Sequence, residues 1–154
     1  MIKLKTKKYL LESETVKLIK EKVTEETCKT NLNPQLIFKQ SFTGYTTKTF
    51  VGNWTQNGFW LSKFRLQLFQ LRPDIIARFQ FKQEANKVNL SIRYSIGFSS
   101  VVLAVVIIFI LSPAFLAFGA LAYFIGVSAM IGLYIKLAFD ELDRLEKAIT
   151  EKLL

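Results

Sequence analysis

A run of 42 residues, Tyr94–Ile135, contains no Asp, Glu, Lys or Arg, and it constrains the fold more than any other feature. One unbroken helix of that length would extend roughly 63 Å, because a helix rises about 1.5 Å per residue. The hydrocarbon core of a bilayer is only about 30 Å thick. Pro113 lacks a backbone N–H and disfavours the helical conformation of the residue before it. The run therefore predicts a hairpin of two membrane-spanning helices, 94–111 and 114–135, with the turn at Ser112-Pro113.

Charge is distributed unevenly around this predicted hairpin. The chain of 154 residues has a net charge of +9, and residues 1–93 hold 17 Lys or Arg against 7 Asp or Glu. Residues 136–154 hold 4 against 5. Basic residues flank the outer ends of the hairpin and none lies at its turn, so the positive-inside rule places both termini in the cytoplasm. We expect an integral membrane protein, of the bacterial inner membrane, whose first span acts as an uncleaved insertion signal.

The segments outside the hairpin predict one cytosolic α+β domain, built from residues 1–93 and completed by residues 136–154. Ile2, Leu4 and Thr6 alternate with lysines, which is the period of a half-buried strand. A helix follows from Ser13, and its apolar face is formed by Val16, Ile19 and Val23.

After Asn33-Pro34 the hydrophobic period changes to two. Apolar residues alternate with polar ones in five predicted strands, which begin near Leu36, Phe50, Trp60, Ile75 and Val88. Matching the apolar faces of neighbouring strands predicts an antiparallel meander from residue 50 to residue 93. In that register a three-residue loop, Gln56-Asn57-Gly58, places Trp54 opposite Trp60 and Phe50 opposite Phe64, and a four-residue loop, 83–86, places Phe81 opposite Val88 and Phe79 opposite Leu90.

A C-terminal amphipathic helix is predicted to continue directly from the second span. Its apolar stripe consists of Leu142, Leu145, Ile149 and Leu153. The economical arrangement packs this helix and the N-terminal helix on the apolar side of the meander. The layout resembles that of small two-span bacterial membrane proteins, a resemblance of architecture that implies no activity.

The predicted outer face of the meander is basic. Its six basic residues, on three adjacent strands, are Lys63, Arg65, Arg78, Lys82, Lys87 and Arg93. No carboxylate is predicted on that face, since Asp74 and Glu84 fall in turns. Beside a membrane such a patch binds anionic lipid headgroups or an acidic protein; alternatively it is a solvated face that only keeps the sheet soluble. Nucleic acid is a weaker hypothesis, because this face lacks a row of stacking aromatic residues.

Small residues recur along the second predicted span. They are Gly119, Ala122, Gly126, Ser128 and Gly132. Small residues four apart allow helix backbones to approach closely. The pattern has two interpretations, packing within the hairpin and docking on a second copy or another membrane protein.

The sequence offers no catalytic motif. It contains one cysteine, Cys28, and no histidine, which removes the commonest general base and metal ligand. It also lacks a phosphate loop, zinc-ligand spacing and paired catalytic carboxylates, so we predict no cofactor and no metal. An enzyme acting on lipid would need polar groups that converge at the membrane, and Arg93, Lys136 and Asp140 are the candidates.

The function that these patterns favour is non-catalytic: a membrane-anchored interaction or accessory protein. Its predicted partners are the bilayer, anionic headgroups and another membrane protein. The alternative is a homo-oligomeric pore or transporter assembled through Gly126 and Gly132, and a lipid-acting enzyme is the weakest of the three hypotheses.

Overall fold

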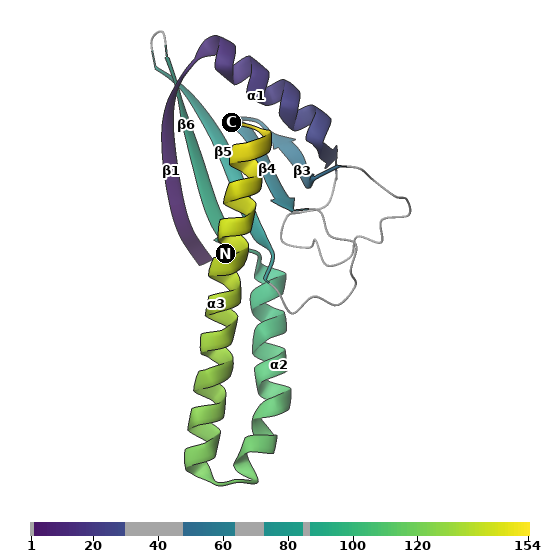
Figure 1. Cartoon of the computed structure of the whole chain (residues 1–154), viewed down its shortest axis with the longest axis vertical. Coiled ribbons are helices and arrows are strands. Elements are labelled where there is room, and N and C mark those ends of the chain that lie inside the picture. Colours follow the sequence, from purple (N-terminus) through teal and green to yellow (C-terminus); the bar gives the residue numbers. More distant parts are fainter. Residues whose placement is uncertain (1, 30–47, 64–72, 85–86) are drawn as a thin grey trace.

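The computed structural model of this chain, described over residues 2–29, 48–63, 73–84 and 87–154, joins a mixed sheet and helices into an α+β fold (Figure 1). Within these residues the strands and helices alternate irregularly along the chain. They are β1 (Ile2–Glu12), α1 (Ser13–Glu26), β2 (Thr27–Lys29), β3 (Phe50–Thr55), β4 (Gly58–Lys63), β5 (Ile75–Glu84), β6 (Lys87–Ile96), α2 (Phe98–Leu116) and α3 (Ala120–Lys152).

The six described strands form one sheet in the order β1-β6-β5-β4-β3-β2. The predicted antiparallel meander is confirmed for β3 to β6, which neighbour one another in chain order. The sheet as a whole is mixed rather than antiparallel, because β2 pairs in parallel with β3. The N-terminal strand closes the other edge by pairing with β6, a contact between distant parts of the sequence. The predicted strand that begins near Leu36 lies outside the described residues.

One face of this sheet, the inner face, is covered by helices. Residues of α1 and α3 share a single buried cluster with alternate residues of the strands. The predicted apolar stripes of both helices are confirmed as the residues that enter this core, namely Val16, Ile19, Val23, Leu142, Leu145, Ile149 and Leu153. The helical period therefore located the covering helices correctly, and the opposite surface of the sheet is the outer face.

The predicted register of β4 is wrong by one residue. Thr55 pairs with Gly58, so the connection holds two residues, and Trp54 lies opposite Phe59 rather than Trp60. Phe59 stacks on Phe79 of β5 with 4.3 Å between ring centroids. Phe59, Trp60 and Leu61 are all buried, on alternating faces. A strand that is apolar on both sides gives no signal of which side faces the helices, and a slip of one residue exchanges the faces.

The pairing of β5 with β6 also extends further toward the connecting turn than predicted. Phe81 lies opposite Leu90 and Phe79 opposite Ile92, and pairing continues to Glu84 opposite Lys87. The predicted partners Val88 and Leu90 are thus displaced by two residues. A displacement of two preserves the faces, so the apolar side of both strands is as expected.

Helix α2 and the first part of α3, residues 98–135, project from the domain as an antiparallel pair that we call the stalk (Figure 1). The predicted helices 94–111 and 114–135 are wrong in their limits. Residues 94–96 belong to β6, and α2 passes through Pro113 to Leu116. The turn lies at Gly119, whose φ of 98° is a left-handed conformation that glycine adopts without strain.

Pro113 does not end the helix because a neighbouring hydroxyl compensates for it. Its missing N–H would have donated to the carbonyl of Phe109. The Oγ of Ser112 donates to that carbonyl instead, at 3.2 Å. Hydroxyl donors of this kind are a known way to satisfy a backbone group freed by proline in an apolar helix.

Helix α3 is continuous from the stalk into the core, as predicted. Among the described residues it is the one helix long and apolar enough to cross a membrane by length and composition. The apolar part of α2, Ser100–Leu116, is shorter than a membrane-spanning helix by the same measure of length.

The α3–sheet contact yields a prediction about stability. Leu145 is 1% exposed in the core, so Leu145→Ala should lower the free energy of unfolding by about 2–5 kcal/mol. Lys147→Ala, at an exposed position two residues away, should change it by less than about 0.5 kcal/mol. Denaturation of the full chain in detergent, monitored by tryptophan fluorescence, measures the free energy of unfolding of both variants. Equal losses of stability in the two variants would contradict this packing.

Candidate functional site

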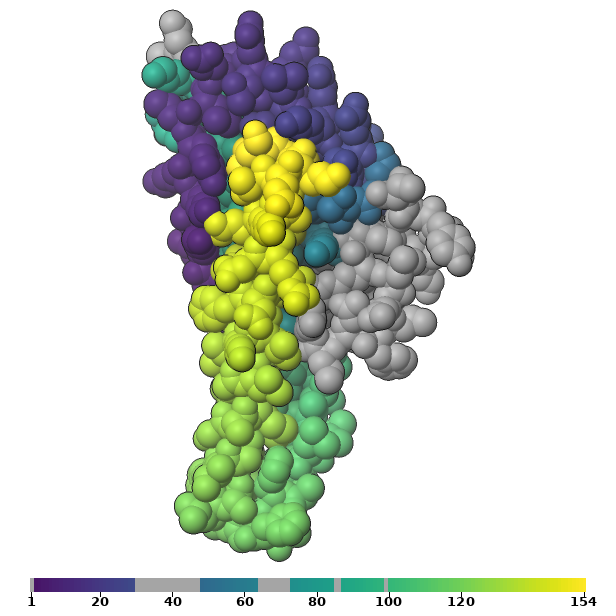
Figure 2. All heavy atoms as spheres, viewed as in Figure 1, coloured from purple at the N-terminus to yellow at the C-terminus, as the bar shows by residue number. Residues whose placement is uncertain are grey.

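The stalk exposes large apolar side chains on both of its helices. Phe109 is 78% exposed, Phe118 82% and Leu121 76%. No residue in the part of α3 that belongs to the stalk is buried. The space-filling view shows the stalk projecting from the end of the domain (Figure 2). Contiguous apolar surface of this kind marks a contact with lipid or with another protein.

The small residues of α3 point in different directions. A Cβ built on Gly126 would lie 2.6 Å from the ring of Phe115, so this glycine lets α2 approach α3. Gly132 has no atom within 4 Å of such a Cβ, and Ser128, one turn earlier, is exposed. Ala122 is half-buried and Gly119 forms the turn. The predicted helix-packing face is therefore divided between contacts inside the hairpin and an open surface.

The outer face of the sheet carries four of the six predicted basic residues. Arg78 of β5 lies directly opposite Arg93 of β6. Lys82 and Lys87 lie on the same face, toward the end of the strands that is remote from the stalk. Lys63 pairs with Phe50 and therefore lies on the inner face, a consequence of the shifted register of β4. Arg65 lies outside the described residues.

The expectation that this face lacks carboxylates is wrong. Glu84 belongs to β5 rather than to a turn, and it lies opposite Lys87. Its carboxylate is 3.5 Å from the Nζ of Lys82. Glu12 of β1 lies opposite Lys87 from the other side. Carboxylates therefore accompany the two lysines at the remote end of the face.

Two basic residues of β1 were missed. Lys3 lies opposite Ser95 and Lys8 opposite Ser91, and both lysines are exposed. They extend the basic surface onto the strand next to β6. The alternation of lysines in β1 was visible in the sequence, but its pairing with β6 joins residues about 90 apart and no local pattern indicates it.

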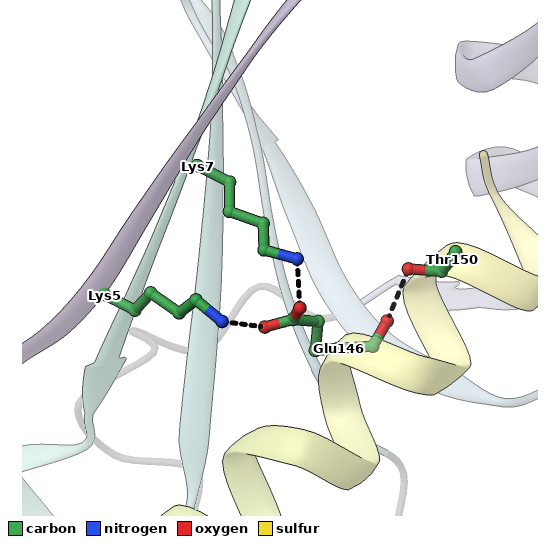
Figure 3. Close-up of polar contacts among 4 residues, drawn as sticks. All are labelled: Lys5, Lys7, Glu146 and Thr150. Carbon is green, nitrogen blue, oxygen red and sulfur yellow. Dashed lines mark hydrogen bonds and ion pairs between the residues drawn. The ribbon is translucent and has the colours of Figure 1, made fainter.

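An ion cluster joins β1 to α3 across the inner face (Figure 3). Lys5 donates to one carboxylate oxygen of Glu146 at 2.9 Å, and Lys7 donates to the other. We expected Ile2, Leu4 and Thr6 to share the apolar face. Leu4 packs against the core as expected, but a bulge between Lys3 and Lys5 reverses the alternation beyond it, so Thr6 lies opposite Arg93 on the outer face. The side chains of Lys5 and Lys7 consequently face the helix, where Glu146 neutralises them.

Protonation equilibria in this cluster are shifted by its contacts. The hydrogen bond to Glu146 raises the pKa of Lys7 above the usual lysine value, against the opposing effect of burial. Partial burial acts to raise the pKa of Glu146, but its hydrogen bonds with Lys7 and Lys5 outweigh burial and lower that pKa. The three charges thus stabilise one another and hold β1 against the C-terminal half of α3.

The three residues considered for catalysis on lipid belong to different layers of the fold. Arg93 lies on the outer face, whereas Lys136 and Asp140 belong to the helix that covers the inner face. The sheet lies between them, so the three residues do not converge. Within the described part of the chain, no three His, Cys, Asp or Glu side chains are grouped to hold a metal ion.

No protein-family model, curated protein sequence or solved structure matches this chain.

The ion cluster predicts a dependence of stability on pH. Because the pKa of Glu146 is lowered from 4.5, its contribution is present above that pH and is lost as the pH falls through the lower value of the folded state. Because the pKa of Lys7 is raised from 10.5, its contribution is lost only as the pH rises through the higher folded value. Thermal unfolding of the full chain in detergent should therefore show a loss of stability below about pH 4.5.

Glu146→Gln should weaken that acid dependence and lower stability by about 1–2 kcal/mol at pH 7, since two charge-assisted hydrogen bonds are lost from a partly exposed site. Glu151→Gln is the matched control on the same helix, because the Lys147–Glu151 pair is 76% and 60% exposed. An unchanged acid profile in the Glu146 variant would show that the cluster contributes nothing measurable.

Proposed function

We propose that this chain is a non-catalytic, membrane-anchored interaction or accessory protein. Its stalk would span the bilayer as a two-helix hairpin and hold the α+β domain at the membrane surface. The observation that carries the proposal is the stalk itself, 38 residues (98–135) that contain no charged residue and expose large apolar side chains on both helices.

The length of the stalk suits a bilayer. The 19 residues of α2 correspond to about 28 Å of helix, close to the hydrocarbon thickness of about 30 Å. Backbone groups within the bilayer must be satisfied internally. The backbone hydrogen bonds of the helix, together with the bond from the Ser112 hydroxyl to the Phe109 carbonyl, meet this demand along α2. The turn at Gly119 would then lie near the far headgroup layer.

The topology follows from the hairpin. Because α2 leaves the domain and α3 returns to it (Figure 1), both termini would lie on one side of the membrane. The excess of Lys and Arg in residues 1–93 favours the cytoplasm for that side. The domain would thus present its basic outer face to cytoplasmic partners or to the inner surface of the bilayer.

One observation supports the alternative, a homo-oligomer assembled through the stalk. Gly132 and Ser128 lie on an open surface of α3 that the hairpin does not use. Small residues on such a surface favour close helix association in membranes. A pore or transporter would also need a polar path, and the charge-free stalk offers little toward one.

Membrane integration is tested by one charge in the stalk. Phe109→Lys places a lysine near the middle of α2, where insertion costs about 3 kcal/mol. The wild-type chain should resist extraction from membranes by alkaline carbonate, and this variant should lose much of that resistance. Leu18→Lys, at a position of α1 that is 57% exposed, is the matched control and should behave as wild type. A wild-type chain that is monodisperse in water without detergent would refute the anchoring role.

The two glycines of α3 distinguish the proposal from its alternative. Gly126→Leu should lower the thermal midpoint in detergent, because the new side chain overlaps the Phe115 ring. Gly132→Leu should leave the midpoint unchanged, since its Cβ meets nothing in the same chain. If the chain self-associates through this surface, native mass in mild detergent should fall from oligomer to monomer in the Gly132 variant. A wild-type monomer would argue against the homo-oligomer.

A further inference from the structure

We propose that the part of the outer face nearest the stalk binds the phosphate groups of anionic lipids, through Lys3 and Arg93 with Arg78 beside them. This inference rests on the proposed membrane anchoring and names a partner for the domain. It separates the predicted basic patch into a half that touches the headgroup layer and a half that does not.

The position of these residues follows from the strand register. Ile96, the last residue of β6, pairs with Ile2 on one side and Ile75 on the other, and Gly97 alone separates it from α2. The strands thus end together at the base of the stalk, and they run away from it along the same general direction (Figure 1). Height above the membrane can therefore be counted in residues along the strands.

The basic residues near the base lie within reach of headgroups. Lys3 is one residue from Ile2, the first residue of β1, and Arg93 is three residues from Ile96. Three residues of a strand span about 10 Å at 3.4 Å per residue. The headgroup region extends about 5–8 Å beyond the hydrocarbon on each side. Both residues are exposed, and their long side chains can cover the remaining distance.

The chemistry of the paired arginines suits a phosphate. Arg78 and Arg93 lie directly opposite each other on neighbouring strands, so their guanidinium groups share one region of the outer face. A phosphate group can accept hydrogen bonds from two guanidinium groups at once, and arginine is well shaped for this contact. Asp74, which precedes β5 at the same level, accepts a hydrogen bond from Ser100 Oγ at 3.4 Å.

The remote half of the outer face differs in both position and charge. Lys82 is seven residues beyond Ile75 and Lys87 nine residues from Ile96, which correspond to about 24 and 30 Å. These distances exceed a headgroup layer plus a Debye length of about 8 Å. Glu84 and Glu12 also lie beside these lysines. A lipid surface at the base of the stalk can reach only the basal half.

The test compares two double variants of the full chain that remove the same charge from the same face. Lys3→Gln with Arg93→Gln changes the basal half, and Lys82→Gln with Lys87→Gln changes the remote half. Each protein is reconstituted in phosphatidylcholine bilayers that contain phosphatidylglycerol, and the association of spin-labelled phosphatidylglycerol relative to phosphatidylcholine is measured. Thermal midpoints in detergent establish that all three proteins are equally folded.

We expect wild type and the remote variant to prefer phosphatidylglycerol equally. The basal variant should lose roughly five-fold to thirty-fold of that preference, as expected for one to two basic residues at a membrane surface. Equal losses in both variants would overturn the inference, because they indicate general charge attraction. The inference would also be overturned if the wild-type protein resists carbonate extraction but shows no preference for phosphatidylglycerol over phosphatidylcholine. A rise of its thermal midpoint with inorganic phosphate alone would overturn it too. Failure of wild type to resist carbonate extraction would instead refute the anchoring on which the inference rests.

Discussion

The continuity of α3 is the constraint on which the rest of the structure depends. One helix of 33 residues is apolar and exposed in the stalk, and it becomes amphipathic where it enters the domain after Lys136. Ala138 is its first buried residue, and Leu142, Leu145 and Ile149 then pack against the sheet. Because no glycine or proline interrupts the helix beyond Gly132, the stalk and the domain cannot bend freely about this connection.

The second connection, through Gly97, makes the orientation more definite. The N–H of Gly97 donates to the carbonyl of Asp74 at 2.8 Å, and the N–H of Asp74 donates to Ser100 Oγ at 2.8 Å. These bonds link the start of β5, the end of β6 and the first turn of α2. Together with α3 they hold the sheet upright over the stalk. The basic outer face consequently extends along the direction of the stalk, with one end near the stalk and the other remote from it.

The sequence was informative where the pattern had one interpretation. The buried stripes of α1 and α3 followed from helical period because their opposite sides are polar. It was uninformative where both faces of a segment are apolar, as in the β4 stretch around Trp60, and the position of Lys63 was lost with that register. The end of α2 was misplaced because the Ser112 hydroxyl replaces the hydrogen bond that Pro113 cannot make.

Other parts of the fold and of the candidate site depend on contacts that no local pattern contains. Lys5 and Lys7 face α3, where their partner is Glu146, 139 residues further along the chain from Lys7. The same alternation brings Tyr9 and Leu11 against the core. Lys3 and Lys8 joined the outer face for a similar reason, since the pairing of β1 with β6 is non-local.

Anchoring would also protect the sheet from association. Among the described strands, β1 is an edge strand of 11 residues, and edges of this length readily pair with another chain. The antiparallel pairing of two β1 strands would turn one copy upside down relative to the other. Because the strands run along the stalk, the two stalks would then point in opposite directions and could not enter the same bilayer. Copies in one membrane share a direction, so self-association through the stalk remains open to them, whereas antiparallel self-association through this edge does not.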